Sequence, residues 1–153
     1  MVAFAMEFTG VVRLDQLMQA YGAEWLVLDF NHLFISTSLR EEVWLLRHRD
    51  DRAITEQVIA EAADFGIEGI NADREFHTYS GGEQAILACL LIMAVIKAND
   101  AHDVRILLYN VLESLSADNR ARLVGRFADL QRTHGARAFM HDGKQLREVT
   151  LGC

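Results

Sequence analysis

The sequence contains no proline, only two cysteines and few basic residues. Proline averages about 5% of protein sequences, so its complete absence from 153 residues is unusual. Cys89 and Cys153 are too few for a disulfide framework or a zinc site, which favours a reducing compartment. The 15 basic residues are outnumbered by 22 acidic ones and form no run, so nucleic acid is not expected as a partner.

Long hydrophobic segments are also missing. Met1 is not followed by a basic segment and an apolar core, so no signal peptide is expected. The longest apolar run, residues 85–96, is too short to span a bilayer and is typical of a buried helix. Apolar residues make up 51% of the chain and charged residues 24%, which is a globular composition. We therefore expect a cytoplasmic globular protein.

Apolar runs and helical periodicities alternate along the chain without a repeat or a linker, so residues 1–153 are read as one domain. This alternation predicts an α/β fold with a mainly parallel sheet and flanking helices. The two runs 24–30 and 104–109 are expected to be strands buried on both faces. Further strands are expected within 2–14 (around a Thr9-Gly10 turn), 136–140 and 147–151, and helices at 15–21, 39–47, 53–65, 80–97 and 116–133.

The segment Tyr79-Ser80-Gly81-Gly82-Glu83-Gln84 leads directly into the longest apolar helix. Two glycines let a ligand approach the backbone closely, and the first amides of a helix suit a phosphate. Ser80 adds a hydroxyl. The alternative is an ordinary serine cap followed by a glycine turn, because short motifs often match by chance.

In its context this segment resembles the signature motif of the ATP-binding cassette (ABC) ATPases. Further stretches resemble that family in the same order: residues 37–43 its helical subdomain, 105–109 its Walker B strand, and 139–142 its switch-histidine strand. The resemblance implies a P-loop NTPase-like fold without the P-loop unit, with a helical subdomain of about residues 37–98 inserted between strands. It also implies that Ser80, Gly81, Gly82 and Glu83 contact nucleotide, with His141 as a switch histidine.

The sequence departs from the family at its catalytic positions. A Walker A motif needs GxxxxGK[ST], and neither of the two lysines, Lys97 and Lys144, fits that pattern. The chain begins about where the Walker A helix of the family would end. Asn110 and Val111 stand where the family has the Walker B aspartate and the catalytic glutamate, and Glu113 is a displaced candidate for that base.

The remaining polar residues carry weaker signals. His141 is either the switch histidine or an ordinary surface histidine. The other histidines have no metal-ligand spacing, so no metal site is expected. Cys89 is expected in the core, and Tyr79 is expected to pack before the turn.

Cassette ATPases work as head-to-tail pairs, in which the signature of one subunit closes on nucleotide held by the other. The resemblance therefore implies a non-hydrolysing accessory or regulatory subunit, which shares ATP and Mg²⁺ with a complete ABC ATPase and binds none alone. The complete ATPase could belong to a transporter. In that case a membrane permease is a further partner, and the chain would lie at the inner membrane. The alternatives are a scaffold or protein-interaction module that has lost nucleotide binding, an unrecognised enzyme, and a fragment of a split ATPase.

Loss of the P-loop strand should leave an exposed sheet edge or apolar face. Such surfaces usually mark an interface. We therefore expect a homodimer that uses this face, unless the strands within residues 2–14 fold back and leave a monomer.

Overall fold

The computed structural model describes residues 25–141 and 145–150. They fall into two compact units, one formed by residues 25–31 together with 102–150, the other by His32–Ala101. The helical subdomain expected at about 37–98 lies within the second unit. The elements expected within 2–14 and 15–21 lie outside the described residues.

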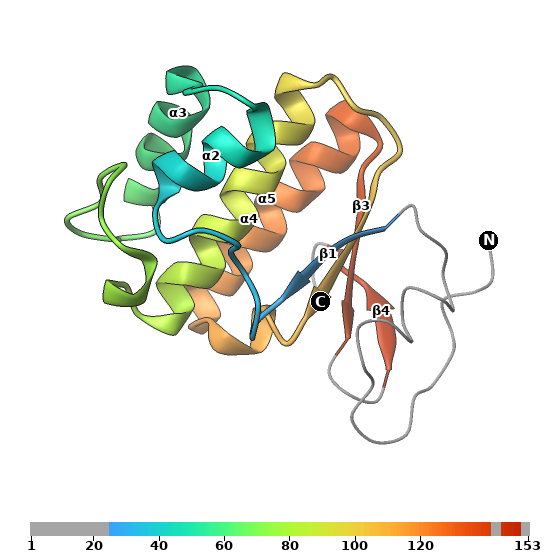
Figure 1. Cartoon of the computed structure of the whole chain (residues 1–153). Coiled ribbons are helices and arrows are strands. Elements are labelled where there is room, and N and C mark those ends of the chain that lie inside the picture. The colour runs from blue at the N-terminus through green and yellow to red at the C-terminus, as the bar shows by residue number, and fades with distance from the viewer. Residues whose placement is uncertain (1–24, 142–144, 151–153) are drawn as a thin grey trace. The chain divides into compact units, whose positions relative to one another are not determined.

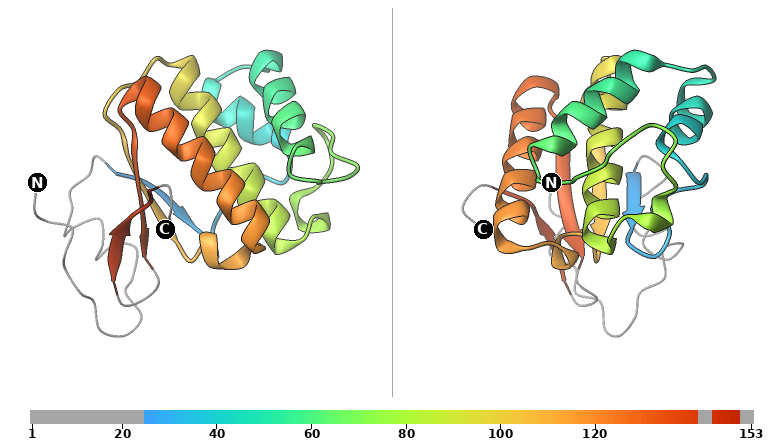
Figure 2. Two further views of the ribbon diagram at one scale, coloured as in Figure 1. Left: turned by 180° about the vertical axis from the view of Figure 1, so that it is seen from behind. Right: turned by 90° about the vertical axis from the view of Figure 1, so that its left-hand side faces the viewer.

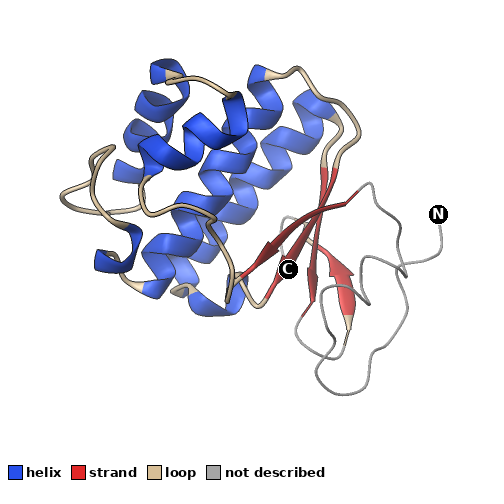
Figure 3. Ribbon diagram, viewed as in Figure 1, coloured by secondary structure: helices blue, strands red, loops and turns tan. Residues whose placement is uncertain are grey.

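The first unit contains a four-stranded sheet in the order β1-β2-β3-β4 (Figure 3). The strands β1 (Trp25–Asp29), β2 (Arg105–Tyr109) and β3 (Arg137–His141) are parallel, and β4 (Leu146–Glu148) runs antiparallel to β3. The α/β fold class and the mainly parallel sheet are thereby confirmed. The expected strands 104–109 and 136–140 agree with β2 and β3 to within one residue.

The helix α5 (Ala117–His134) lies beside β3 in the same unit (Figure 1). Ser116 caps its first turn, since its side chain accepts a hydrogen bond from the Asn119 amide. Gly135 ends the helix with φ +67°, a left-handed conformation that glycine adopts without strain. Both ends were expected from the sequence. The short 3₁₀ helix η3 (Leu112–Ser114) connects β2 to α5.

A hydrophobic cluster formed by Trp25, Leu107, Tyr109, Phe139 and Leu146 joins the four strands of this sheet. The Trp25 and Phe139 rings lie 5.1 Å apart between centroids. The prediction that β1 is buried on both faces is wrong, because Leu26 is 36% exposed. Within the described residues β1 pairs on one edge only, so it lacks the second neighbour that shields β2.

The second unit is helical. It contains α2 (Leu39–Arg47), α3 (Arg52–Ala63), the 3₁₀ helix η2 (Phe76–Thr78) and α4 (Gly81–Ala98). Figure 2 shows α3 running beside α4, and α2 contacts α3. Ten residues of α4 are buried, Cys89 among them, as expected for the most apolar helix of the chain. The segment between α3 and η2 is irregular, as predicted, and an isolated bridge joins Glu75 to Ser38.

Candidate functional site

The Ser80-Gly81-Gly82 turn lies at the N-terminus of α4, and Ser80 and Gly81 are exposed. The Ser80 hydroxyl oxygen accepts a hydrogen bond from the Glu83 amide at 3.1 Å. In return, the Glu83 carboxylate accepts one from the Ser80 amide at 2.9 Å. This reciprocal pair is a capping box, which satisfies two backbone donors that a helix start otherwise leaves unpaired. Ser80 and Glu83 therefore both stabilise the start of the helix.

Serine caps are the usual way in which helices begin in this chain. Ser38 caps α2 and Ser116 caps α5, each through the amide three residues on. What distinguishes α4 is the pair of glycines in its first turn and the carboxylate of Glu83 folded back over the helix end. The two glycines leave the backbone of the first turn accessible, which favours binding of an anion. The Glu83 carboxylate adds a negative charge at the same place, which disfavours it.

The loop before this turn is held by Arg74. Its guanidinium donates to the Thr78 carbonyl at 2.8 Å and to the Glu68 carbonyl at 3.0 Å. The same guanidinium lies 3.8 Å from the centre of the Tyr79 ring. Tyr79 is buried, as the sequence predicted, so the residue before Ser80 is fixed by packing and by this cation–π contact. Arg74 was not singled out from the sequence.

The degenerate Walker B positions follow β2 in the first unit. Asn110 has φ +57°, a left-handed conformation that asparagine tolerates better than most residues, and its amide donates to the His141 carbonyl at 3.2 Å. Val111 is fully buried and has no group that could take a proton from water. Glu113 lies in η3 and is exposed.

His141 is fully buried at the end of β3. Its ring stacks on that of Tyr109, with centroids 5.4 Å apart and an angle of 19° between the planes. The alternative that His141 is an ordinary surface histidine is therefore wrong. The structure places Ser80–Glu83 in the helical unit and Asn110, Val111 and His141 in the sheet unit, where the last three lie together at the ends of β2 and β3.

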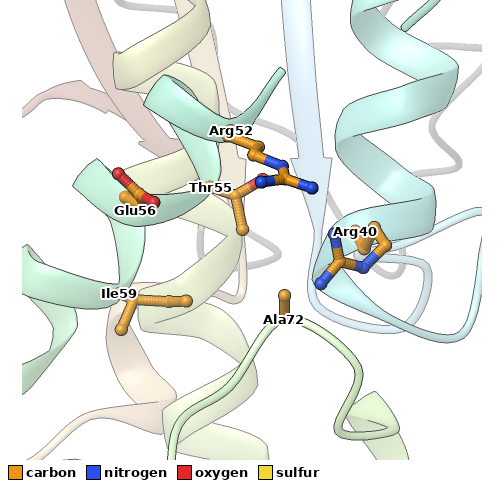
Figure 4. Close-up of a pocket in the computed structure, with 6 residues that line it drawn as sticks. All are labelled: Arg40, Arg52, Thr55, Glu56, Ile59 and Ala72. Atoms are coloured by element: carbon orange, nitrogen blue, oxygen red, sulfur yellow. The ribbon is translucent and has the colours of Figure 1, made fainter. Parts of the chain in front are cut away.

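A pocket of about 340 Å³ in the helical unit was missed by sequence reasoning. In Figure 4 the Arg52 guanidinium points from α3 toward Arg40 on α2, above Ala72. Thr55, Glu56 and Ile59 complete the lining. No sequence motif could have revealed it, because its walls come from segments far apart in the chain.

The two arginines at this pocket are already paired with acids. Arg40 binds Asp73 through two hydrogen bonds, of 2.7 and 3.3 Å, and Asp50 lies 3.4 Å away. The hydrogen bond to Asp73 raises the pKa of Arg40, and the same bond lowers the pKa of Asp73. Arg52 lies 3.7 Å from Asp50. The pocket therefore presents ion pairs rather than an unbalanced positive charge.

Over residues 25–141 and 145–150, no three histidine, cysteine, aspartate or glutamate side chains gather in a way that could hold a metal ion. In the same part of the chain, α4 alone has the length and apolar composition of a membrane-crossing helix, and just over half of it is buried within the protein.

No protein-family model matches this chain, and no curated protein matches it.

Proposed function

We propose that this chain is a non-hydrolysing relative of the ABC ATPases. It acts as an accessory or regulatory subunit that offers its Ser80–Gly82 turn to a nucleotide held by a partner ATPase. The observation that supports this most is the exposed start of α4, where Gly81 and Gly82 are the first two residues of an 18-residue helix. Such a helix end attracts phosphate through its unpaired amides and its dipole.

The proposal includes a P-loop NTPase-like architecture without the P-loop unit, and two features of the fold support it. Three parallel strands follow one another in chain order, and the helical unit is inserted between β1 and β2. The residues after β2, where the family carries its Walker B acids, are Asn110 and Val111. Residues 1–153 contain neither a P-loop lysine nor those acids, which supports a role other than hydrolysis of a triphosphate by these residues alone.

In this proposal ATP and Mg²⁺ are shared across an interface, and the chain binds neither tightly alone. The partner that holds the nucleotide is a complete ABC ATPase, because a second copy of this chain has no Walker A motif with which to hold it. The assembly works in the cytoplasm, and at the inner membrane where the partner ATPase serves a permease.

The test uses a charge placed at the turn and a matched control. Gly81→Asp puts a carboxylate at the first position of α4, and Ala117→Asp puts one at the same position of α5, which also follows a serine cap. An acidic residue there favours the helix through the dipole, so both variants should stay folded. Only Gly81→Asp should repel a phosphate at α4.

The tagged chain is captured from a lysate of its source organism with Mg-ATP, with a non-hydrolysable analogue, or without nucleotide. We expect a Walker A-containing protein to associate only when nucleotide is present, and the association to be lost in Gly81→Asp and kept in Ala117→Asp. Association that is equal without nucleotide and in both variants would contradict the proposal.

That contrary result would support the second candidate, a scaffold or interaction module. The capping box favours this candidate. Ser80 and Glu83 are already hydrogen-bonded to each other, and the Glu83 carboxylate places a negative charge at the start of the helix.

We also expect no ATPase activity above background in the purified chain. Glu113 lies two residues beyond the position of the catalytic glutamate in the sequence, and it is exposed. A steady turnover that follows the protein through a second column, and disappears in Glu113→Gln, would show that this expectation is wrong.

A further inference from the structure

Large hydrophobic side chains are exposed on and beside α2. Trp44 is 54% exposed, Leu45 41% and Leu46 40%, and Ile35, in the loop before the helix, is 87% exposed. We call these four residues the α2 patch. Within the described residues the only other large hydrophobic side chain exposed to this degree is Leu26, on β1 in the other unit. Large apolar side chains exposed together in one short segment often mark an interaction surface.

The helical unit does not need the α2 patch for its own packing. The inner side of α2 is formed by Leu39, Glu42 and Val43, all of which are buried. Trp44 and Leu45 therefore present apolar surface beyond the helix face that the unit already buries. Leu46 lies one turn after Glu42 and Val43, on the buried face, and is nevertheless 40% exposed.

Ile35 is held next to this surface by Glu42. The Glu42 carboxylate accepts hydrogen bonds from the Ile35 amide at 3.1 Å and from the Ser36 amide and hydroxyl at 2.8 and 2.7 Å. Since Glu42 lies one turn before Leu45 and Leu46, the loop is tied down beside the patch. The patch is therefore a fixed feature of the unit.

The polar groups around the patch are arranged in a self-complementary way, with a carboxylate that accepts hydrogen bonds at the start of α2 and an imidazole that can donate one at its end. Glu41 lies in the first turn of α2, Arg47 lies in its last turn, and His48 and Arg49 follow it. Arg47 and Arg49 share Asp51, whereas His48 is exposed at the end of the helix. A two-fold axis between Trp44 and Leu45 would bring Glu41 of one copy across from His48 of the other, since Glu41 lies three residues before Trp44 and His48 three residues after Leu45.

We infer that two copies of this chain associate through the α2 patch, with their α2 helices antiparallel about a two-fold axis. In this arrangement Trp44 of each copy meets Leu45 of the other at the centre, and Glu41 and His48 face each other on both sides. The antiparallel helix dipoles also attract. Closed two-fold dimers are the commonest assembly of identical chains.

This contact uses no nucleotide and so goes beyond the proposed function. It also differs from the interface expected from the sequence, which lay on the sheet. Two nine-residue helices bury less than a standard interface, so the dimer should be weak, with a dissociation constant on the order of tens of micromolar.

The experiment measures the mass of the full chain by sedimentation equilibrium from low micromolar to several hundred micromolar. The wild type should rise from 17.3 kDa toward twice that mass. Trp44→Glu should weaken the association at least tenfold. Leu26→Glu is the matched control, because it adds the same charge at the other exposed apolar side chain, and it should leave the association unchanged.

A charge reversal tests the orientation of the two helices. Glu41→Lys alone should weaken the dimer, and Glu41→Lys combined with His48→Glu should restore it. Circular dichroism confirms that each variant is folded before its mass is measured.

Three results would overturn the inference. The first is a monomer at every concentration, and the second is an association lost in Leu26→Glu but kept in Trp44→Glu. The third is a variant with both Glu41→Lys and His48→Glu that associates no better than Glu41→Lys alone. A monomer whose Trp44 is shielded from a fluorescence quencher would show that another part of the same chain covers the patch. None of these results bears on nucleotide-dependent binding of a partner ATPase, so the two proposals can fail separately.

Discussion

The capping box at Ser80 makes a stability prediction that separates its structural role from any role in binding. Ser80→Ala removes the hydroxyl that accepts from the Glu83 amide at 3.1 Å. Loss of a serine cap costs about 1 kcal/mol, with a range of about 0.5–2. In a protein of this size about 1 kcal/mol corresponds to a fall of roughly 2–4 °C in melting temperature.

Ser116→Ala is the matched control for this measurement. Ser116 accepts from the Asn119 amide at 3.2 Å and has the same extended backbone conformation as Ser80. The two substitutions should therefore cost about the same, as measured by urea denaturation followed by circular dichroism. Hydrogen exchange then assigns each loss to a helix, because only Ser80→Ala should weaken protection in the first turn of α4.

The reciprocal bond adds a second expectation. Glu83→Ala removes the partner of the Ser80 amide, at 2.9 Å. The two hydrogen bonds stabilise the same turn. The loss in free energy of unfolding in the double variant, Ser80→Ala with Glu83→Ala, should therefore be smaller than the sum of the losses in the two single variants. A Ser80→Ala variant as stable as the wild type, beside a Ser116→Ala variant that loses about 1 kcal/mol, would refute the assignment of Ser80 as a structural cap.

The remaining predictions concern the rest of the fold. Gly125→Ala should raise the free energy of unfolding by about 0.5–1 kcal/mol, because Gly125 lies within α5 and an added Cβ meets nothing within 4 Å; urea denaturation measures this. Gly135→Ala should lower it by about 1–2 kcal/mol or more in the same assay, because φ is +67° and the Cβ would lie 2.5 Å from an Asp103 oxygen. The hydrogen bond from Arg137 lowers the pKa of Glu148. The ionised Glu148 therefore adds to the free energy of unfolding at neutral pH, and this stabilisation is lost as the pH falls below about 4.5. Glu148→Gln should make the free energy of unfolding depend less on pH in that range. Burial raises the pKa of the Cys89 thiol far above its usual range, so a thiol reagent should modify Cys89 in urea and not in the native protein.

Much of the fold could be predicted from local sequence signals. The helix α2 was predicted with its observed bounds, and α5 was delimited by Ser116 and Gly135, which lie at its ends in the structure. The apolar runs predicted the positions of β1, β2 and β3. They could not show that β1 leaves Leu26 exposed, because an apolar run looks alike in a central strand and at a sheet edge.

The candidate site was less predictable than the fold. The sequence Ser80-Gly81-Gly82-Glu83 has a serine followed three residues later by a glutamate, which is the pattern of a capping box. The alternative of an ordinary serine cap predicted the role of Ser80, but not the reciprocal bond of Glu83. The burial of His141 could not be foreseen, because it depends on the position of Tyr109 on a neighbouring strand. The pocket between Arg40 and Ala72 depends on a contact between distant segments, in which the Arg40 amide donates to the Ala72 carbonyl.

The carboxylate of Glu83 is central to the choice between the two candidate functions. It lies at the end of α4 where a phosphate would have to lie, and it accepts the Ser80 amide that helps to orient the turn. Two negative charges about 4 Å apart repel by about 1 kcal/mol in water and by about 4 kcal/mol near a protein surface. A phosphate can therefore bind closely only if Glu83 turns away, which opens the capping box and gives up part of the helix start. A nucleotide held by a partner can supply that energy through its own contacts, whereas free ATP has only this turn to bind. The turn is thus better suited to respond to a nucleotide that another subunit presents than to capture one from solution.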